Sequence, residues 1–330
     1  MTEIRHDVIG IGNAIVDVVV HAEDAFLETE GLVKGAMSLV DAGRADDLYD
    51  KVGPAVECSG GSAANTIAGL ASLGVRTAFI GKVRDDMLGR VFTHDIRSIG
   101  VEFNTAAATD GPPTATCLVL VAPDAHRTML THLGACVELG PDDIDDDVIA
   151  ASAITYLEGY LWDPPAAKEA FVKAAAVAHA YERDVALSLS DPFCVDRHRD
   201  EFLALVESHV DILFANEEEI MSLYQVENFD DALQHVRGHC RVAALTRSEK
   251  GSIIVSGDEV HVVDAEPVDH VVDTTGAGDA FAAGFLKGLV DGADLARAAH
   301  LGGVCAAEVI SHLGARSETP LGQLVADKLG

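Results

Sequence analysis

The sequence predicts an α/β fold, with a mostly parallel central sheet, helices on both faces and a small β-sheet lid. Short apolar runs rich in β-branched residues alternate with helical stretches along the chain. Nearly every residue of the central runs is apolar, which is typical of parallel strands buried on both faces. Two stretches break the alternation and look like strands without helices between them. We therefore expect residues 1–330 to form a single domain, with the lid built from segments near 14–41 and 104–135.

The individual elements are predicted from local pattern, in chain order. Strands are expected at residues 8–11, 16–20, 77–80, 153–157, 185–189, 212–214, 242–246, 252–255 and 260–263, each a short run rich in apolar and β-branched residues. Helices are expected at residues 62–73, 165–181 and 201–208. The first of these ends before Gly74, a residue type that commonly follows a helix C-terminus.

The strands without intervening helices are expected at residues 36–40, 114–121 and 128–133. The last two are joined through Ala-Pro-Asp-Ala-His-Arg, which suits a hairpin connection. Such a group can form a small sheet that stands off the main domain. The sheet is either a lid over a cleft or an edge extension used for dimerisation, so the sequence leaves both a monomer and a homodimer open.

The composition is strongly acidic, because 54 Asp and Glu residues against 23 Lys and Arg give a net charge of −31. We find no basic cluster, so nucleic acid and anionic membrane surfaces are not expected partners. No apolar run approaches the ~18 residues of a membrane span. The N-terminal residues lack the pattern of a signal peptide, so we expect a cytoplasmic protein. The acidity fits a solvated surface, and an anionic ligand would need backbone N–H groups and a metal to offset this field.

The cysteines and histidines argue against several kinds of site. The six cysteines form no C-x-x-C pair, and the closest two, Cys117 and Cys136, are 19 positions apart. This spacing argues against a zinc site or a redox pair, and reduced core thiols are expected instead. The chain also lacks H-E-x-x-H and G-x-S-x-G. Neither a zinc protease nor a serine hydrolase is therefore indicated.

The most informative motif is the Gly-rich turn Gly276-Ala277-Gly278, which follows a β-rich run and precedes a helix expected from near Asp279. Small residues there let backbone N–H groups converge on an anion at a helix N-terminus, where the dipole is positive. Asp279 either caps this helix or accepts a proton from an attacking hydroxyl group. Both interpretations stay open on this motif alone. The segment is not a Walker A loop.

Two N-terminal segments are consistent with a ligand that carries hydroxyl groups. Gly60 and Gly61 precede an Ala-rich helix, and Asn65 in its first turns can both donate and accept hydrogen bonds. Asp17 interrupts an apolar run and needs partners, for which sugar hydroxyls are well suited. The alternatives are a tight turn with helix packing for the glycine pair, and a solvent-facing strand end for Asp17.

A fourth segment, Asn216 to Glu219, follows the apolar strand expected at 212–214. Ligands bind at the carboxyl ends of strands in open α/β sheets. Oxygen ligands there would suit Mg²⁺, directly or through water. The alternative is a solvated acidic start of a helix.

These four segments occur in one order, and together they resemble the ribokinase-like, or PfkB, family of carbohydrate and nucleoside kinases. The resemblance extends from residue 7 to about residue 320, and the run Asp273 to Asp279 is its most specific signature. Within the family the sequence is most similar to the adenosine kinase branch. This similarity rests on the spacing Gly12-Asn13-x-x-x-Asp17 and on lid-like runs at 113–117 and 127–135.

The resemblance implies roles at the matching positions. Asp279 would be the general base that deprotonates a 5′-hydroxyl group, and Gly276, Ala277 and Gly278 would form an anion hole. The residues implied to bind the nucleoside are Asn13, Asp17, Gly60, Gly61 and Asn65 around the ribose, Leu39, Met129, Thr131, Tyr160 and Phe193 around the base, and Arg127, which reaches the phosphates or closes the lid.

The resemblance also implies MgATP as the phosphate donor. The residues implied to line the ATP site are Asn216, Thr246, Ser248, Gly251, Gly276, Gly278 and His300. Asn216 and Glu219 would organise Mg²⁺, through water. Asp273 and Thr275 resemble positions near a monovalent-cation site, for an ion such as K⁺.

The function that follows from this resemblance is ATP-dependent phosphorylation of the 5′-hydroxyl of adenosine to AMP, a step of purine salvage. Its partners would be two small molecules, ATP and a nucleoside. Two alternatives stay open. The first is another kinase of the family, acting on a free sugar or on inosine and guanosine. The second, of a different class, is a regulatory protein that binds nucleotide without turnover.

Overall fold

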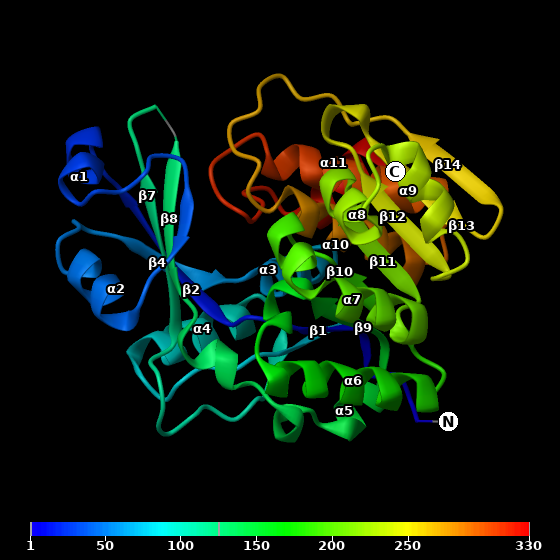
Figure 1. Cartoon of the computed structure of the whole chain (residues 1–330), viewed down its shortest axis with the longest axis horizontal. Helices are drawn as coiled ribbons and strands as arrows, with labels where there is room; N and C mark the ends of the chain where they lie inside the picture. The colour runs from blue at the N-terminus through cyan, green and yellow to red at the C-terminus, as the bar shows by residue number, and fades with distance from the viewer. Residues whose placement is uncertain (1, 125, 330) are drawn as a thin grey trace.

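The computed structural model describes residues 2–124 and 126–329, which form a nine-stranded sheet and a five-stranded sheet with helices around them (Figure 1). The large sheet has the order β14-β13-β12-β11-β10-β9-β1-β5-β6. Its strands from β12 to β6 are parallel, and β13 and β14 extend it as antiparallel neighbours. Their bounds are β1 (His6–Ile11), β5 (Thr77–Ile80), β6 (Glu102–Phe103), β9 (Ser152–Glu158), β10 (Asp184–Ser188), β11 (Ile212–Asn216), β12 (Val242–Thr246), β13 (Ser252–Ser256) and β14 (Glu259–Val263).

Helices cover both faces of the large sheet, as the apolar strands predict. In β1, Val8 belongs to one core and Ile9 to the other, so successive side chains are buried on opposite faces. The first face packs against α3 (Ser62–Ser72), α4 (Met87–Ser98), α10 (Ala277–Val290), α11 (Leu295–Val309) and α12 (Leu321–Leu329). The second packs against α5 (Asp146–Ala150), α6 (Pro165–Ala180), α7 (Pro192–His209), α8 (Glu217–Tyr224) and α9 (Phe229–Val236).

The small sheet stands beside the large one, on the left in Figure 1, with two short helices on its outer side. Its order is β3 (Met37–Leu39), β8 (Arg127–His132), β7 (Ala115–Val121), β2 (Ile15–His21) and β4 (Val56–Gly60). One face of the sheet packs with α1 (Asp24–Thr29) and α2 (Ala42–Tyr49) through residues such as Val18 and Leu120. On the opposite face, Cys117, Val119 and Val121 form a separate cluster that includes Leu313 from the end of the chain. The small sheet therefore turns an apolar face toward the main domain.

The structure differs from the sequence-based expectation at α7, α10 and β4, among other elements. Helix α7 begins at Pro192 rather than near residue 201, because the Asp191 carboxylate accepts hydrogen bonds from the backbone N–H groups of Phe193 and Cys194. Helix α10 begins at Ala277, two residues before Asp279. Strand β4 was not predicted, because its sequence Val-Glu-Cys-Ser-Gly has little apolar pattern and its conformation comes from pairing with β2.

Two expectations drawn from composition can be compared with the described residues. Within them, all six cysteines are free thiols, and four of these are buried. No helix in the same residues combines the length and the apolar character that a membrane crossing requires.

Helices α10 and α11 pack closely against each other at two glycines. A Cβ on Gly284 would lie 2.5 Å from the carbonyl oxygen of Leu301, and a Cβ on Gly302 would lie 2.8 Å from that of Phe281. The two backbones can approach this closely only because glycine occupies these positions.

We predict that Gly284→Ala lowers the free energy of unfolding by about 1–3 kcal/mol, because the two helices must separate to accept the methyl group. Gly303→Ala in α11 is the matched control, since a Cβ there meets no atom within 4 Å. The control should be neutral or stabilising by up to about 1 kcal/mol, from helix propensity alone. Chemical denaturation of both variants measures the difference, and equal stabilities would contradict this account of the packing.

Candidate active site

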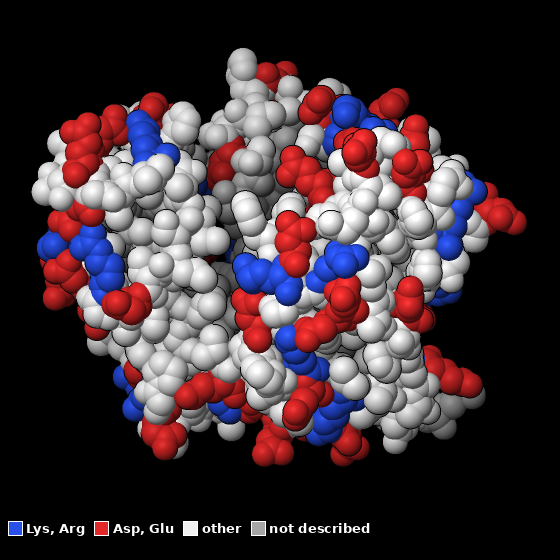
Figure 2. All heavy atoms as spheres, in the orientation of Figure 1, with Lys and Arg blue, Asp and Glu red and all other residues white. Residues whose placement is uncertain are grey.

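The predicted site residues gather where the parallel strands end. Asn13 follows β1, and Glu158, Asn216 and Thr246 are the last residues of β9, β11 and β12. Parallel strands bring their carboxyl ends to one edge of the sheet, which is the usual place for a ligand in such folds. Figure 2 shows a hollow between the small-sheet lobe and the main body, with acidic side chains spread over both.

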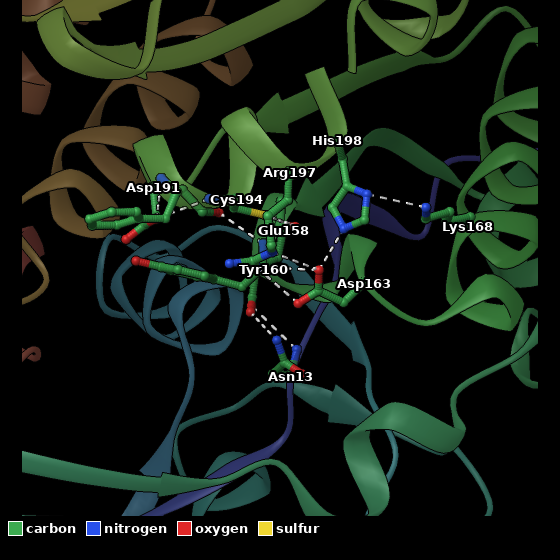
Figure 3. A network of polar contacts seen from close by, with 12 residues as sticks. Asn13, Glu158, Tyr160, Asp163, Lys168, Asp191, Cys194, Arg197 and His198 are labelled. Carbon is green, nitrogen blue, oxygen red and sulfur yellow. Dashed lines mark hydrogen bonds and ion pairs between the residues drawn. The ribbon is translucent and has the colours of Figure 1, made fainter. Parts of the chain in front are cut away.

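A buried carboxylate, Glu158, connects two of the predicted binding segments. Its Oε1 accepts a hydrogen bond of 2.6 Å from Nδ2 of Asn13, and its Oε2 accepts from the backbone N–H groups of Asn13 (3.3 Å) and Ala63 (2.8 Å). Figure 3 shows the Asn13 amide pointing at this carboxylate. The Ala63 N–H lies in the first turn of α3, whose N-cap Gly61 has no side chain to accept it. Glu158 thus fixes the turn after β1 against the start of α3.

Glycine is required where these segments meet. Ile11 pairs with Leu157, so Gly12 lies next to Glu158, and a Cβ on Gly12 would be 2.3 Å from its Oε2. Gly61 has φ of +101°, and its Cβ would lie 2.1 Å from the carbonyl oxygen of Asn13. Burial raises the pKa of Glu158 to about 7, although three N–H donors oppose this shift.

Asp279 lies at the start of α10 and faces α3. It is the third residue of α10, and Gly276 is the N-cap, so Asp279 is not at the position of a helix cap. Its Oδ1 accepts a 2.6 Å hydrogen bond from the Ser62 hydroxyl, and its Oδ2 accepts one of 3.4 Å from Nδ2 of Asn65. Burial raises the pKa of Asp279 to about 6 against these bonds. A carboxylate with this pKa is ionised at pH 7 and can still accept a proton effectively.

Asp17 lies in the middle of β2 rather than at a strand end, opposite Cys58 on β4 and Cys117 on β7. The neighbouring Gly60 leaves room for it, since a Cβ there would lie 2.4 Å from Oδ2 of Asp17. Burial raises the pKa of Asp17 to about 6, and the charge of Arg316 opposes the rise. The charge of Asp17 is a further, smaller cause that raises the pKa of Asp279.

The Gly-rich turn has the features of an anion site. Gly276 adopts the left-handed conformation with φ of 77°, and a Cβ on it would lie 2.5 Å from the carbonyl oxygen of Ala315. A Cβ on Gly278, by contrast, would meet no atom within 4 Å. The N–H groups in the first turn of a helix have no acceptor within the helix, and the dipole there is positive. The Ala277 N–H already donates to the carbonyl oxygen of Thr274, so the donors that remain for an anion at this turn are the N–H groups of Gly278 and Asp279, beside open space at Gly278.

The structure joins Arg127 and Asp273, to which the sequence analysis gave separate roles. Arg127, the first residue of β8, forms an ion pair of 2.9 Å with Oδ2 of Asp273, and both side chains are 9% exposed. The same oxygen accepts from the Gly314 N–H, and Oδ1 accepts from the Thr275 N–H. Both carboxylate oxygens are thus occupied in this arrangement. The predicted K⁺ site at Asp273 and Thr275 stays a prediction, and no step is derived through a monovalent cation.

The predicted magnesium residues form a capping box on α8. The Asn216 side chain accepts from the Glu219 N–H, while the Glu219 carboxylate accepts from the backbone N–H and Nδ2 of Asn216. Burial raises the pKa of Glu219 to about 7. In the described residues no group of three or more His, Cys, Asp or Glu side chains is placed to hold a metal ion. A carboxylate and an amide oxygen at this edge fit Mg²⁺ that keeps most of its waters.

The remaining predicted residues fall into two groups. Leu39, Met129 and Thr131 belong to the adjacent strands β3 and β8 of the small sheet, whereas Tyr160 and Phe193 follow strands of the large sheet. Leu39 and Phe193 are 63% and 75% exposed, so apolar surface is available at both sides of the hollow. On the expected ATP side, Thr246 of β12 pairs with Asn216 of β11, and Ser248 and Gly251 lie at the two ends of the turn that follows β12. Nε2 of His300 lies 3.4 Å from Oε2 of Glu266.

Three residues of the site were missed by the sequence analysis. Glu158 ends a buried strand, as Asn216 does, so the rule used for Asn216 could have found it. Ser62 could have been inferred from its place directly after the glycine pair. Arg316 donates from Nε to Oδ1 of Asn65 at 3.0 Å, but it lies 251 positions away in an irregular segment, and no local signal marks it.

Comparison with known proteins gives one family and several relatives. Residues 33–321 match the model of the pfkB family of carbohydrate kinases. The crystal structure of adenosine kinase from Sinorhizobium meliloti has a TM-score of 0.90 and 52% identity, covering 98% of this chain and 99% of that one. The structure of a probable sugar kinase from Rhizobium etli CFN 42 has a TM-score of 0.91 and 49% identity, covering 99% of both chains. The ATP-dependent ribose-1-phosphate kinase of Halopiger xanaduensis is 32% identical over 267 residues, 79% of this chain and 83% of that protein.

The two glycines of the turn allow a direct test of the anion site. Gly276→Ala should lower the free energy of unfolding by about 1–3 kcal/mol, because it strains φ and clashes with Ala315. Gly278→Ala should keep or slightly raise stability, since the position is helical and open. Its methyl group should nevertheless weaken ATP binding about tenfold, comparable to the loss of one charge-assisted hydrogen bond. Thermal unfolding and calorimetry measure both effects, and unchanged ATP affinity in Gly278→Ala would contradict the assignment.

Proposed function

Because this chain belongs to the pfkB family of carbohydrate kinases, we propose that it transfers the γ-phosphoryl group of ATP to the 5′-hydroxyl of adenosine, giving AMP and ADP. The chain has the ribokinase-like α/β fold of its neighbours. The observation that carries the proposal is the position of Asp279, at the start of α10 beside the Gly-rich turn and within hydrogen-bond distance of Ser62 and Asn65. The 52% identity with the Sinorhizobium adenosine kinase supports the choice of acceptor.

In the proposed reaction the 5′-oxygen attacks the γ-phosphorus while the bond from that phosphorus to the bridging oxygen breaks. Asp279 takes the hydroxyl proton, for which its pKa of about 6 is suited near pH 7. The N–H groups at the start of α10 stabilise the charge on the transferring group. Mg²⁺, held with its waters near Asn216 and Glu219, would neutralise phosphate charge when bound. Positioning and charge stabilisation account for most of the expected rate enhancement.

The acceptor would be held from two sides. Asp17 and Asn65 offer acceptor and donor groups to the ribose hydroxyls, and the Asn13 turn lies beside them. The exposed apolar side chains around the hollow would enclose a purine ring, and burying such a ring contributes several kcal/mol. Closing the small sheet over the acceptor would exclude water, as a lid does.

A second candidate is phosphorylation of a sugar or sugar phosphate. It is favoured by the identity of 32% with a ribose-1-phosphate kinase and of 49% with a probable sugar kinase. Arg316 and Arg127, which lie close enough to Asp17 to influence its pKa, offer positive charge that an anionic acceptor would need. A regulatory protein without turnover is less well supported, because Asp279 keeps both of its hydrogen-bonding partners.

Asp279→Asn should reduce kcat by about 10²–10⁴-fold while ATP binding stays near the parent value, because a general base contributes that much. In the parent, kcat/KM should fall as the pH drops below about 6, since protonation of Asp279 removes the base. Steady-state rates between pH 5 and 8 measure both effects. Retention of kcat within about threefold would show that Asp279 is not the base.

Side-by-side kinetics on adenosine, 2′-deoxyadenosine, inosine, ribose and ribose 1-phosphate test the acceptor. Adenosine should have the highest kcat/KM, and ribose should lose kcat as well as affinity, because remote binding energy also orients the reacting group. The 2′-deoxy analogue should lose about tenfold or more, since Asp17 would keep its burial and lose a hydroxyl partner. If ribose 1-phosphate or a free sugar is preferred, the adenosine assignment is wrong and the kinase assignment remains.

A further inference from the structure

The short segment 313–316, after α11, touches the small sheet, the Gly-rich turn and the start of α3. Leu313 packs against the small sheet, and the Gly314 N–H donates to Asp273. Ala315 packs against Gly276 in the Gly-rich turn. Arg316 reaches the start of α3, where its Nε donates to Oδ1 of Asn65 at 3.0 Å.

The contact with Arg316 decides which way the Asn65 amide faces. Because Oδ1 accepts from the guanidinium group, Nδ2 is directed at Oδ2 of Asp279, 3.4 Å away. The opposite amide orientation would place Oδ1 against the carboxylate and Nδ2 against the guanidinium group, and both contacts would be unfavourable. Arg316 is anchored from its other side, since Nη1 donates to Oδ2 of Asp95 at 3.4 Å.

We propose that Arg316 is a positioning residue for phosphoryl transfer, which orients the Asn65 amide toward Asp279 and supplies positive charge to the group of carboxylates around the acceptor. The proposal rests on the proposed function only in taking Asp279 as the base. It does not depend on which acceptor is phosphorylated.

The charge around Asp279 explains why a cation matters there. Among the titratable groups around Asp279, Arg316 and Asp17 of β2 shift its pKa, and the charge of Asp279 in turn raises the pKa of Tyr156 and Glu158 of β9 and of Tyr160 after β9. All except Arg316 are acidic groups. Arg316 and the hydrogen bond from Asn65 both lower the pKa of Asp279, against burial. Loss of Arg316 should therefore raise this pKa and leave less of the base ionised at neutral pH.

The direct test is the pKa of the Asp279 carboxyl group, measured by NMR on protein with ¹³C-labelled Asp and assigned with Asp279→Asn. Arg316→Gln should raise it by about one pH unit, because an opposite charge and an oriented hydrogen bond are lost together. Arg316→Lys keeps the positive charge but lacks the planar guanidinium group, so it should raise the pKa of Asp279 less. Arg90→Gln is the matched control, since Arg90 on α4 is an exposed arginine paired with Asp85, and it should leave the pKa unchanged.

Kinetics then separate positioning from a structural role. With the acceptor that the parent prefers, the acid limb of kcat/KM should move to higher pH in Arg316→Gln by the same amount as the pKa. The losses of Asn65→Ala and Arg316→Gln at high pH should not add in the double variant, since one acts through the other. Thermal unfolding of each variant shows whether it is folded. If Arg316→Gln does not fold, Arg316→Lys takes its place in the double-variant comparison with Asn65→Ala.

An unchanged Asp279 pKa in Arg316→Gln and Arg316→Lys, or fully additive losses with no shift of the acid limb, would overturn the proposal. The NMR measurement needs no turnover. A parent that phosphorylates none of the acceptors would therefore overturn the proposed function, while the pKa shift would still decide the role of Arg316.

Discussion

The site depends on one buried carboxylate. Glu158 is 1% exposed, and its two oxygens accept from Asn13 and from the start of α3, segments that are about fifty residues apart in sequence. Positions 12 and 61 require glycine, because the turn after β1 and the start of α3 approach so closely that an added Cβ would clash at either position. Asn65 and Ser62 on the first turns of α3 in turn contact Asp279. The relative position of the proposed acceptor-binding groups and the proposed base therefore follows from the hydrogen bonds of Glu158.

In the proposed reaction this strongly acidic chain would bind phosphate groups with few cations. Its net charge of −31 works against anionic ligands, and the proposed phosphate site uses backbone N–H groups at a helix start rather than a cluster of lysines. The arginines that are present connect parts of the site: Arg127 joins the small sheet to Asp273, and Arg316 joins the end of the chain to Asn65. The segment 313–316 thus links the small sheet, the Gly-rich turn and α3 in four consecutive residues. Movement of the small sheet would be transmitted to the turn through these contacts.

Much of the fold could be predicted, because hydrophobic periodicity and residue composition can be read from short stretches of the sequence. Strands β1, β5 and β9 to β14 follow from short apolar runs, and the two-faced burial of β1 explains why those runs do not alternate. Strand β4 could not be predicted, since its pairing with β2 is tertiary. The motif residues Asp279, Asn65 and Asp17 lie where glycines and interrupted apolar runs indicated. Arg316 and the ion pair of Arg127 with Asp273 could not be found, because they join distant segments through side chains alone.

The kinetic effect of Glu158→Gln tests most directly whether this carboxylate holds the acceptor site together. Gln is the same size, but its amide nitrogen must face one of the N–H donors that the carboxylate accepts. The account predicts that KM for the acceptor rises about tenfold or more while KM for ATP stays within about twofold, since the phosphate turn is anchored elsewhere. Glu308→Gln is the control, because that carboxylate also accepts from two backbone N–H groups, those of Glu318 and Thr319, and should leave acceptor KM unchanged. An acceptor KM equal to that of the parent in a folded Glu158→Gln variant would contradict the account.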